Sequence, residues 1–306
     1  FTRNTQMMKE RTLRVLEFTK IRDRLASKAM TDMGRERCEA LVPSSNMTEI
    51  QRMQAETEEA TVILQYVGAS PLVPFSDVRA SLTLAEKGAT LSPKALLEVA
   101  ALMQSARAAR KALDTERDNT PILKELAQRL STLHNVEQDI TNAIISEDEI
   151  ADRASNELMD IRRHLRGANE RIKEKLNQMI RSSAFQKYLQ DPIVTMRNDR
   201  YCLPVKAEYR GSVPGLVHDQ SSTGATLFIE PMAAVEMGNE LKTWAAKEKQ
   251  EIERILAALS AEIAPYADQL RETVETLAEL DYIFAKGMLS REMNAVSPKL
   301  NQNGYI

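Results

Sequence analysis

Several side chains between residues 191 and 230 could bind phosphate groups, because they lie on or near predicted turns. They are Arg197, Arg200, Lys206, Arg210, Gln220 and the hydroxyl run Ser221, Ser222 and Thr223. Cations, hydroxyls and the backbone N–H groups that turns leave available are common phosphate ligands. Residues 191–230 also hold five acidic against four basic residues, so the segment has no net attraction for a polyanion. Phosphate contact and ordinary hairpin turns therefore both remain open.

The sequence contains no set of residues spaced for catalysis or for cofactor binding. No glycine is followed by Lys-Ser or Lys-Thr, so a P-loop that would hold nucleotide phosphates is absent. The three histidines, His134, His164 and His218, lie far apart and outside any His-Glu-x-x-His pattern. Cys38 and Cys202 are also distant, which argues against a disulfide framework and a cysteine metal site. We predict no catalytic residue, no cofactor and no metal ligand within this chain.

A second group of cations lies in residues 153–190, where nine basic residues stand against four acidic ones. It includes Arg162, Arg163, Arg166, Arg171, Lys173, Lys175, Arg181 and Lys187. A row of cations along a helix can follow a nucleic-acid backbone. Residues 231–292 hold seven basic against twelve acidic residues, so the two segments can instead pair through opposite charges. Pairing is the favoured interpretation, and nucleic-acid contact remains the alternative.

The composition predicts a mainly helical, soluble protein that resides in the cytoplasm. Only 10 glycines and 11 prolines occur in 306 residues, which is fewer than usual. The net charge of −3 gives no bulk attraction to nucleic acid or to an anionic membrane. No window approaches the ~18 apolar residues that a membrane-spanning helix needs. Any nucleic-acid contact must therefore come from a local surface.

Residues 8–148 are predicted to form a core domain of successive amphipathic helices. Asn46 has the type and position of a helix N-cap, and Ser92-Pro93 has the pattern of a second helix start. Residues 1–7 show no helical period, so we expect them to be vector-derived or disordered, ahead of a start near Met7 or Met8.

Two long helices are predicted beyond residue 148. In residues 149–190, apolar residues from Ala151 to Ile172 advance by alternating steps of three and four, the spacing of a coiled-coil seam. Residues 231–292 have a similar spacing, with a kink expected near Pro265. We call these segments the outgoing arm and the returning arm. Each must bury an apolar stripe, so we expect them to pack antiparallel on each other.

Between the arms, residues 191–230 change to short apolar runs separated by turns, and we call this segment the tip. Four strands are predicted, with turns at Asn198-Asp199, at residues 209–212 and at residues 221–224. The predicted fold is mainly α, with a helical core domain, two long antiparallel arms and a small four-stranded antiparallel sheet at their tip.

Two stretches of the sequence resemble a known family. Residues 200–231 read RYCLPVKAEYRGSVPGLVHDQSSTGATLFIEP and resemble the segment characteristic of the second bacterial MutS group, the Smr-domain-bearing paralogues of mismatch-repair MutS. Residues 12–21 read TLRVLEFTKI and resemble the opening helix of that group. The resemblance extends over nearly the whole chain. It implies a core domain, two lever helices and a clamp, similar to the third and fourth domains of MutS.

The resemblance also implies a function for the chain. In the family, an ATPase domain that binds ATP and Mg²⁺ follows, and then a nuclease-associated Smr domain, so this chain is expected to be an N-terminal fragment without enzymatic activity. The resemblance implies that residues 293–306 return to the core domain and begin that ATPase domain. Family members are dimers whose clamps hold branched or duplex DNA, or act on collided ribosomes and their rRNA. A structural coiled-coil arm that joins protein partners remains the alternative. The sequence alone decides neither between DNA and the ribosome nor whether the fragment dimerises.

Overall fold

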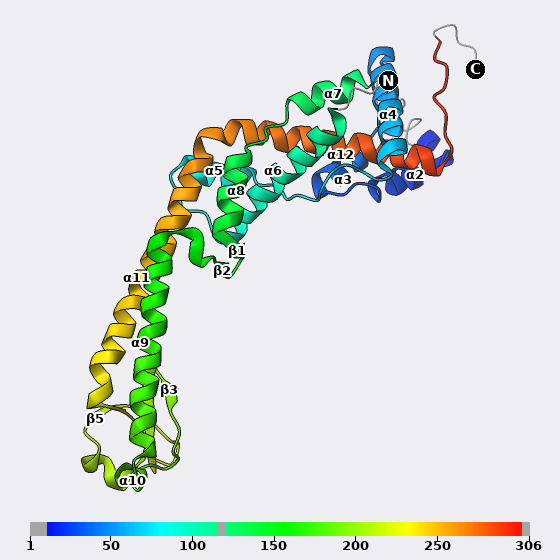
Figure 1. Ribbon diagram of the computed structural model, residues 1–306. Coiled ribbons are helices and arrows are strands. Elements are labelled where there is room, and N and C mark those ends of the chain that lie inside the picture. Colours follow the sequence, from blue (N-terminus) through cyan, green and yellow to red (C-terminus); the bar gives the residue numbers. More distant parts are fainter. Residues whose placement is uncertain (1–10, 115–119, 302–306) are drawn as a thin grey trace. The chain divides into compact units, whose positions relative to one another are not determined.

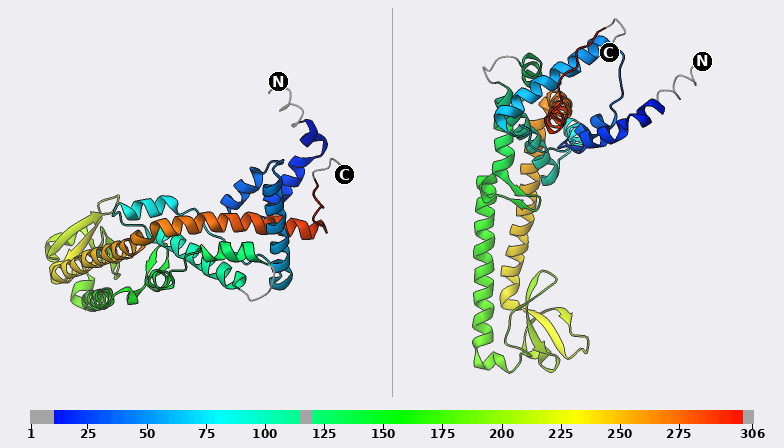
Figure 2. Two further views of the ribbon diagram at one scale, coloured as in Figure 1. Left: turned by 90° about the horizontal axis from the view of Figure 1, so that it is seen from above. Right: turned by 90° about the vertical axis from the view of Figure 1, so that its right-hand side faces the viewer.

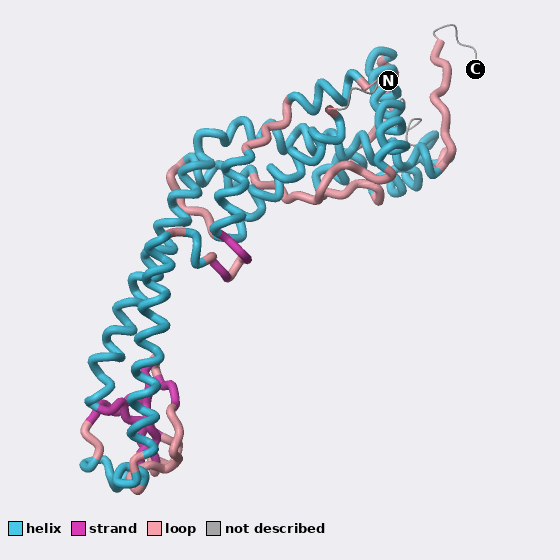
Figure 3. Tube along the Cα trace, viewed as in Figure 1, coloured by secondary structure: helices cyan, strands magenta, loops and turns pink. Residues whose placement is uncertain are grey.

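The computed structural model describes residues 11–114 and 120–301 (Figure 1). The chain divides into two compact units. Unit 1 comprises Phe1–Glu149 and Leu256–Ile306, and unit 2 comprises Ile150–Ile255. The predicted class is confirmed, because the described chain is mainly helical and contains one small four-stranded antiparallel sheet (Figure 3). The expectation for residues 1–7 lies outside the described residues.

Unit 1 is a cluster of helices built around one central helix, α12 (Ala267–Glu292). The helices around it are α2 (Phe18–Ala26), α3 (Asp32–Glu39), α4 (Met47–Val67), α5 (Arg79–Glu86), α6 (Pro93–Leu113), α7 (Pro121–Gln128) and α8 (His134–Ala143). Helix α12 contacts α2 to α7, and Figure 2 shows it, in orange to red, running among the other helices of the unit. Its buried side chains, among them Leu270, Val274, Leu277 and Phe284, form the middle of the core. Apolar burial of this extent is the main stabilising term of the unit.

The helix starts predicted in unit 1 are confirmed at two positions. The Asn46 side chain accepts hydrogen bonds from the backbone N–H groups two and three residues later, at 3.1 and 3.4 Å. Ser92 accepts one from the backbone N–H of Ala95 at 3.2 Å, with Pro93 as the first helical residue. These caps satisfy backbone donors that have no partner inside the helix.

The two arms of unit 2 run antiparallel. They are α9 (Asn156–Arg181) and the first part of α11 (Met232–Ile263), which lie side by side in Figures 1 and 2. Residues later in α9 contact residues earlier in α11, as antiparallel packing requires. The contacts that show this are Ser155–Glu251, Arg162–Glu248, His164–Trp244 and Arg171–Glu240. The seam of α9 is buried at Leu158, Ile161, Ala168, Ile172 and Leu176. The heptad spacing thus identified the buried side of this helix.

The outgoing helix is shorter than the predicted span of 149–190. Strands β1 (Ile144–Ser146) and β2 (Glu149–Ile150) form a hairpin, and the 3₁₀ turn η1 (Asp152–Ala154) follows. Helix α9 then starts behind Ser155, whose hydroxyl accepts from the backbone N–H of Leu158 at 2.9 Å. The helix ends where the backbone becomes extended at Ser182, and the short helix α10 (Ser183–Gln186) follows.

The residues after α10 join the sheet instead of continuing the helix. The carbonyl of Tyr188 accepts from the backbone N–H of Lys206 at 2.9 Å, and the N–H of Gln190 donates to Pro204 at 2.8 Å. Leu189 forms an isolated bridge with Val205. Pairing with a distant strand therefore outweighs the local helical pattern here, because it satisfies the same backbone groups and buries Leu189.

The returning helix is divided at Pro265. Helix α11 begins directly after strand β6, the 3₁₀ turn η3 (Ala264–Tyr266) interrupts the α-helical pattern, and α12 follows. The physical reason is that proline lacks a backbone N–H and its ring crowds the preceding turn.

The tip is a four-stranded antiparallel sheet of β3 (Thr195–Arg197), β4 (Arg200–Lys206), β5 (Gly215–Gln220) and β6 (Thr226–Pro231), with the 3₁₀ turn η2 (Ala207–Ser212) between β4 and β5. The strand order is β3-β4-β6-β5. Asn198 and Asp199 have φ of 49° and 58° and form the two-residue turn that their types predict. The sheet core is Leu203, Val205, Val213 and Ile229, packed on Ile172, Leu176, Leu189 and Ala234.

Candidate nucleic-acid interface

The turn between β5 and β6 presents the predicted hydroxyl run. The N–H of Ser221 donates to the carbonyl of Thr226 at 2.9 Å, and the Ser221 hydroxyl accepts from the N–H of Thr226 at 3.1 Å. Gly224 has φ +70°, the left-handed conformation that closes the turn. Ser222, Thr223 and the preceding Gln220 are exposed. The turn is therefore fixed by Ser221 and offers two hydroxyls and an amide to solvent.

Arg197 is held over an aromatic ring of the same sheet. Its guanidinium carbon lies 4.0 Å from the centroid of the Phe228 ring, and its Nε atom lies 3.2 Å from Oδ2 of Asp219. Its Nη1 atom donates to the carbonyl of Met196 at 2.8 Å. The side chain keeps 38% of its area exposed, so an oriented guanidinium faces solvent.

Arg200 belongs to a buried network that holds the sheet to α11. Its Nη1 atom lies 3.0 Å from Oε1 of Glu230, and its Nη2 atom donates to Asn239 at 2.8 Å. The Glu230 carboxylate is completely buried and also meets Nε2 of His218 at 2.8 Å. A Cβ at Gly238 would lie 2.4 Å from Oε1 of Glu230, so a glycine is needed there. Arg200 thus compensates a buried carboxylate, and 14% of its side chain remains exposed.

The structure does not bring all eight predicted contact residues together. Lys206 pairs with Thr226, and the guanidinium of Arg197 lies over Phe228, two residues further along β6 on the same face. Arg197, Lys206 and the turn Ser221–Thr223 therefore gather at the start of β6, and we call this group the β6 surface. Gln220 pairs with Leu227 and so lies on the opposite face of the sheet.

The other two cations lie near the end of β6. Arg200 contacts Glu230, while Arg210 donates to the carbonyls of Val213 and Gly215 at 3.3 and 3.1 Å, and Gly215 pairs with Pro231. Arg210 is exposed and ties η2 to the start of β5. Sequence spacing cannot show this division, because it depends on strand register.

The cations of the outgoing arm divide between the two interpretations that the sequence left open. Arg162 and Arg171 pair with the returning arm, at 2.7 Å to Glu248 and 2.8 Å to Glu240. Arg163 and Arg166 pair instead with Asp160 and Asp152, which lie on the outgoing side. Lys173, Lys175, Arg181 and Lys187 are exposed. Interhelical pairing is thus present at two positions, and much of the arm's positive charge faces solvent.

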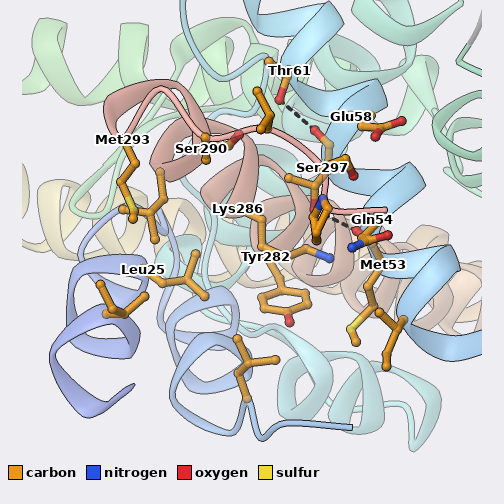
Figure 4. Close-up of a pocket in the computed structure, with 18 of the residues that line it drawn as sticks. Leu25, Met53, Gln54, Glu58, Thr61, Tyr282, Lys286, Ser290, Met293 and Ser297 are labelled. Atoms are coloured by element: carbon orange, nitrogen blue, oxygen red, sulfur yellow. Dashed lines mark hydrogen bonds between the residues drawn. The ribbon is translucent and has the colours of Figure 1, made fainter. Parts of the chain in front are cut away.

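Unit 1 contains an apolar groove that no predicted site residue lines (Figure 4). It has a volume of about 670 Å³ between α2, α4, α12 and residues 295–298. Lys286 points into it from α12, with its Nζ atom 3.2 Å from Oε2 of Glu56 and 4.6 Å from the centroid of the Tyr282 ring. Burial lowers the pKa of Lys286 and raises that of the Tyr282 hydroxyl to about 12. The sequence feature that could have identified Lys286 is a lysine that falls within the apolar stripe of the returning arm.

In the described ranges 11–114 and 120–301, no group of three or more His, Cys, Asp or Glu residues is arranged to hold a metal ion. Cys38 and Cys202 are buried, and burial raises their thiol pKa to about 12 and about 11. Within the same ranges, no helix combines the length and apolar character needed to cross a bilayer.

Comparison with known proteins bears out the resemblance seen at residues 12–21 and 200–231, although no family model matches the chain. Endonuclease MutS2 of Alkaliphilus oremlandii (strain OhILAs) is 48% identical over 301 residues, which cover 98% of this chain and 38% of that protein. Endonuclease MutS2 of Acetivibrio thermocellus is 46% identical over 304 residues, and that of Geobacillus sp. (strain WCH70) is 44% identical over 302, with the same coverage. This chain is therefore homologous to Endonuclease MutS2 over a stretch that spans 38% of the length of those relatives.

Proposed function

We propose that unit 2 is the nucleic-acid clamp of a MutS2-like ATPase, and that the β6 surface makes the contact. The observation that carries this proposal is the grouping of Arg197, Lys206 and the Ser221–Thr223 turn at the start of β6. Two cations and exposed hydroxyls on one rigid sheet form a surface suited to phosphate oxygens. Homology to proteins named endonucleases supports a nucleic-acid partner.

The partner in this proposal is branched or duplex DNA, or the rRNA of a collided ribosome. The clamp acts in the cytoplasm, and a dimer of the whole protein places two clamps around one partner. This chain makes the contact with the nucleic-acid partner, while ATP-driven movement and strand cleavage belong to other parts of the whole protein. Stiff paired arms suit this role, because α9 alone is 26 residues, or about 39 Å at 1.5 Å per residue.

A second candidate is a structural arm that joins protein partners without touching nucleic acid. The ion pairs Arg162–Glu248 and Arg171–Glu240 favour it, because they show cations of the outgoing arm already satisfied by the returning arm. In this case the arms would serve as a spacer, and binding would depend on apolar contacts.

Salt dependence separates the two candidates. The chain is titrated with branched DNA, with linear duplex and with ribosomes at two salt concentrations. A clamp that contacts several phosphates loses affinity steeply as salt rises, because each contact releases counterions. Binding of a protein partner with little change between the two salt concentrations, and absence of binding to all three nucleic-acid partners, would support the structural arm.

A further inference from the structure

The aromatic side chains of unit 2 keep part of their surface in solvent. All six are half-buried, namely Phe185, Tyr188, Tyr201, Tyr209, Phe228 and Trp244. A cation lies over four of these six rings, at 4.9 Å for Lys187 on Tyr188, 5.9 Å for Lys173 on Tyr201, 4.0 Å for Arg197 on Phe228 and 4.2 Å for Lys247 on Trp244. Unit 2 thus combines partly exposed rings with cations at close range.

Three of the rings form one group, which we call the Tyr188 cluster. The Phe185 and Tyr188 centroids are 5.9 Å apart with an interplanar angle of 87°, and those of Tyr188 and Tyr209 are 5.3 Å apart at 56°. These edge-on and tilted contacts do not stack one ring face on another. Phe185 lies on α10 and Tyr209 on η2, so two separate elements supply the rings on either side of Tyr188.

The cluster is anchored by the sheet. The carbonyl of Tyr188 accepts from the N–H of Lys206 at 2.9 Å, and the neighbouring Leu189 is buried against Val205. All three rings pack on the edge of the sheet core and keep part of their surface in solvent. An anchored ring loses little entropy when a ligand stacks on it.

One cation is shown over a ring of this cluster. Lys187 is exposed, with its Nζ atom 4.9 Å from the centroid of the Tyr188 ring. A base that stacks on an aromatic side chain brings its phosphate within reach of such a cation, and this combination is typical of surfaces that bind single strands. The bases of a duplex are stacked on each other and have no free face to offer.

We propose that the Tyr188 cluster binds unpaired nucleotides, by stacking bases on its rings while Lys187 holds a phosphate. The proposal rests on the proposed clamp function and adds to it a class of partner, single-stranded segments next to a branch or in a loop. The cluster supplies the part of binding that depends on the presence of a base, and the β6 surface supplies contacts that any phosphate backbone can satisfy.

The test uses the full 306-residue chain and three probes of equal phosphate number. They are an oligothymidylate strand, the same strand with abasic sites in place of the bases, and a duplex. The chain should bind oligothymidylate about tenfold more tightly than the abasic strand, because base stacking is worth ~1–3 kcal/mol per base and ~1.4 kcal/mol is tenfold. Tyr188→Phe should keep this preference and Tyr188→Leu should remove it. Tyr66→Leu in unit 1, at a tyrosine that is 63% exposed, is the matched control and should keep the preference.

The outcomes distinguish this proposal from the clamp itself. Equal affinity for oligothymidylate and the abasic strand, with the duplex still bound, overturns the stacking site and leaves the clamp intact. Binding of none of the probes overturns both. A preference that persists in Tyr188→Leu assigns stacking to another surface and also overturns the proposal. Circular dichroism of Tyr188→Leu checks the fold, and Tyr188→Phe gives an independent result if the leucine variant does not fold.

Discussion

The Nε atom of Arg162 lies 2.7 Å from Oε1 of Glu248, and this hydrogen-bonded ion pair joins the two arms of unit 2. The same guanidinium donates through Nη1 to Asp152 at 2.6 Å and to the carbonyl of Ile150 at 2.7 Å. Only 20% of the Arg162 side chain is exposed. A single arginine therefore links the start of the outgoing arm, its first helical turns and the returning arm.

Replacing Arg162 by Glu should destabilise unit 2 by about 2 kcal/mol or more, because charge-assisted hydrogen bonds to a partly buried group are lost. Arg163→Glu is the matched control. Arg163 is 70% exposed and pairs within its own helix with Asp160, so its replacement should cost no more than about 0.5 kcal/mol.

Urea denaturation followed by the fluorescence of Trp244 measures this difference. Trp244 is the single tryptophan of the chain and stacks on His164 at 4.3 Å, across the two arms. Equal destabilisation by both substitutions would show that the arms do not depend on the Arg162 contacts.

Unit 2 should lose stability in acid. The hydrogen bond from Arg162 holds the pKa of Asp152 below its ordinary value, with Arg166 adding to the effect, and the hydrogen bond from Arg254 does the same for Glu251. Carboxyl groups with lowered pKa contribute stability that is present above their unfolded pKa of about 4 and is lost as pH falls through the folded pKa. The urea midpoint reported by Trp244 should therefore be constant from pH 7 to 5 and fall below about pH 4.

The same measurement on Arg162→Met checks the assignment. Without the guanidinium, the pKa of Asp152 returns toward its ordinary value, so the acid-dependent part of the stability should become smaller. A loss of the same size in Arg162→Met and in the parent chain would assign the pH dependence to other groups.

The Lys286–Glu56 pair in unit 1 should show strong coupling. Its side chains are 11% and 6% exposed, and Arg52 also reaches Glu56 at 3.0 Å. Removing one member of a buried pair leaves the other charge with fewer partners, which costs about 3–5 kcal/mol in comparable cases. Lys286→Met should therefore lower the thermal midpoint of unit 1 strongly, whereas the double variant with Glu56→Leu should recover much of the loss.

A double-mutant cycle measured by circular dichroism gives the coupling energy of this pair. Lys20→Met serves as the control, because Lys20 is 71% exposed and its loss should have little effect. Simple additivity of the two single substitutions would show that Lys286 and Glu56 do not depend on each other.

The fold could be read from the sequence wherever local rules decide the structure. Asn198 and Asp199 tolerate left-handed backbone and form the expected turn, and Ser92-Pro93 begins the expected helix. The end of the outgoing helix could not be read, because Leu189 fits a helical stripe and only pairing with Val205, sixteen residues later, draws it into the sheet.

The candidate site was predictable in residue type and only partly in position. Arg200 has the same type and the same nearness to a turn as Arg197, yet it is committed to the buried carboxylate of Glu230. That contact spans thirty residues and depends on strand register, which spacing does not encode. Contact by the individual residues of the β6 surface stays a prediction.

The central claim is that the β6 surface contacts nucleic acid, and a charge-matched pair of variants tests it most directly. In one variant Arg197 and Lys206 are changed to Gln. In the control, Arg35 and Lys111, two exposed cations of unit 1, are changed to Gln. Affinities for branched DNA and for ribosomes are measured over a series of salt concentrations.

The β6-surface variant should bind more weakly than the parent, and its salt slope should fall by about two, one for each phosphate contact removed. The control should bind like the parent, because it carries the same change in net charge on unit 1 and leaves the β6 surface intact. If both variants bind like the parent, or if only the control is impaired, the β6 surface is not where this protein holds its nucleic-acid partner.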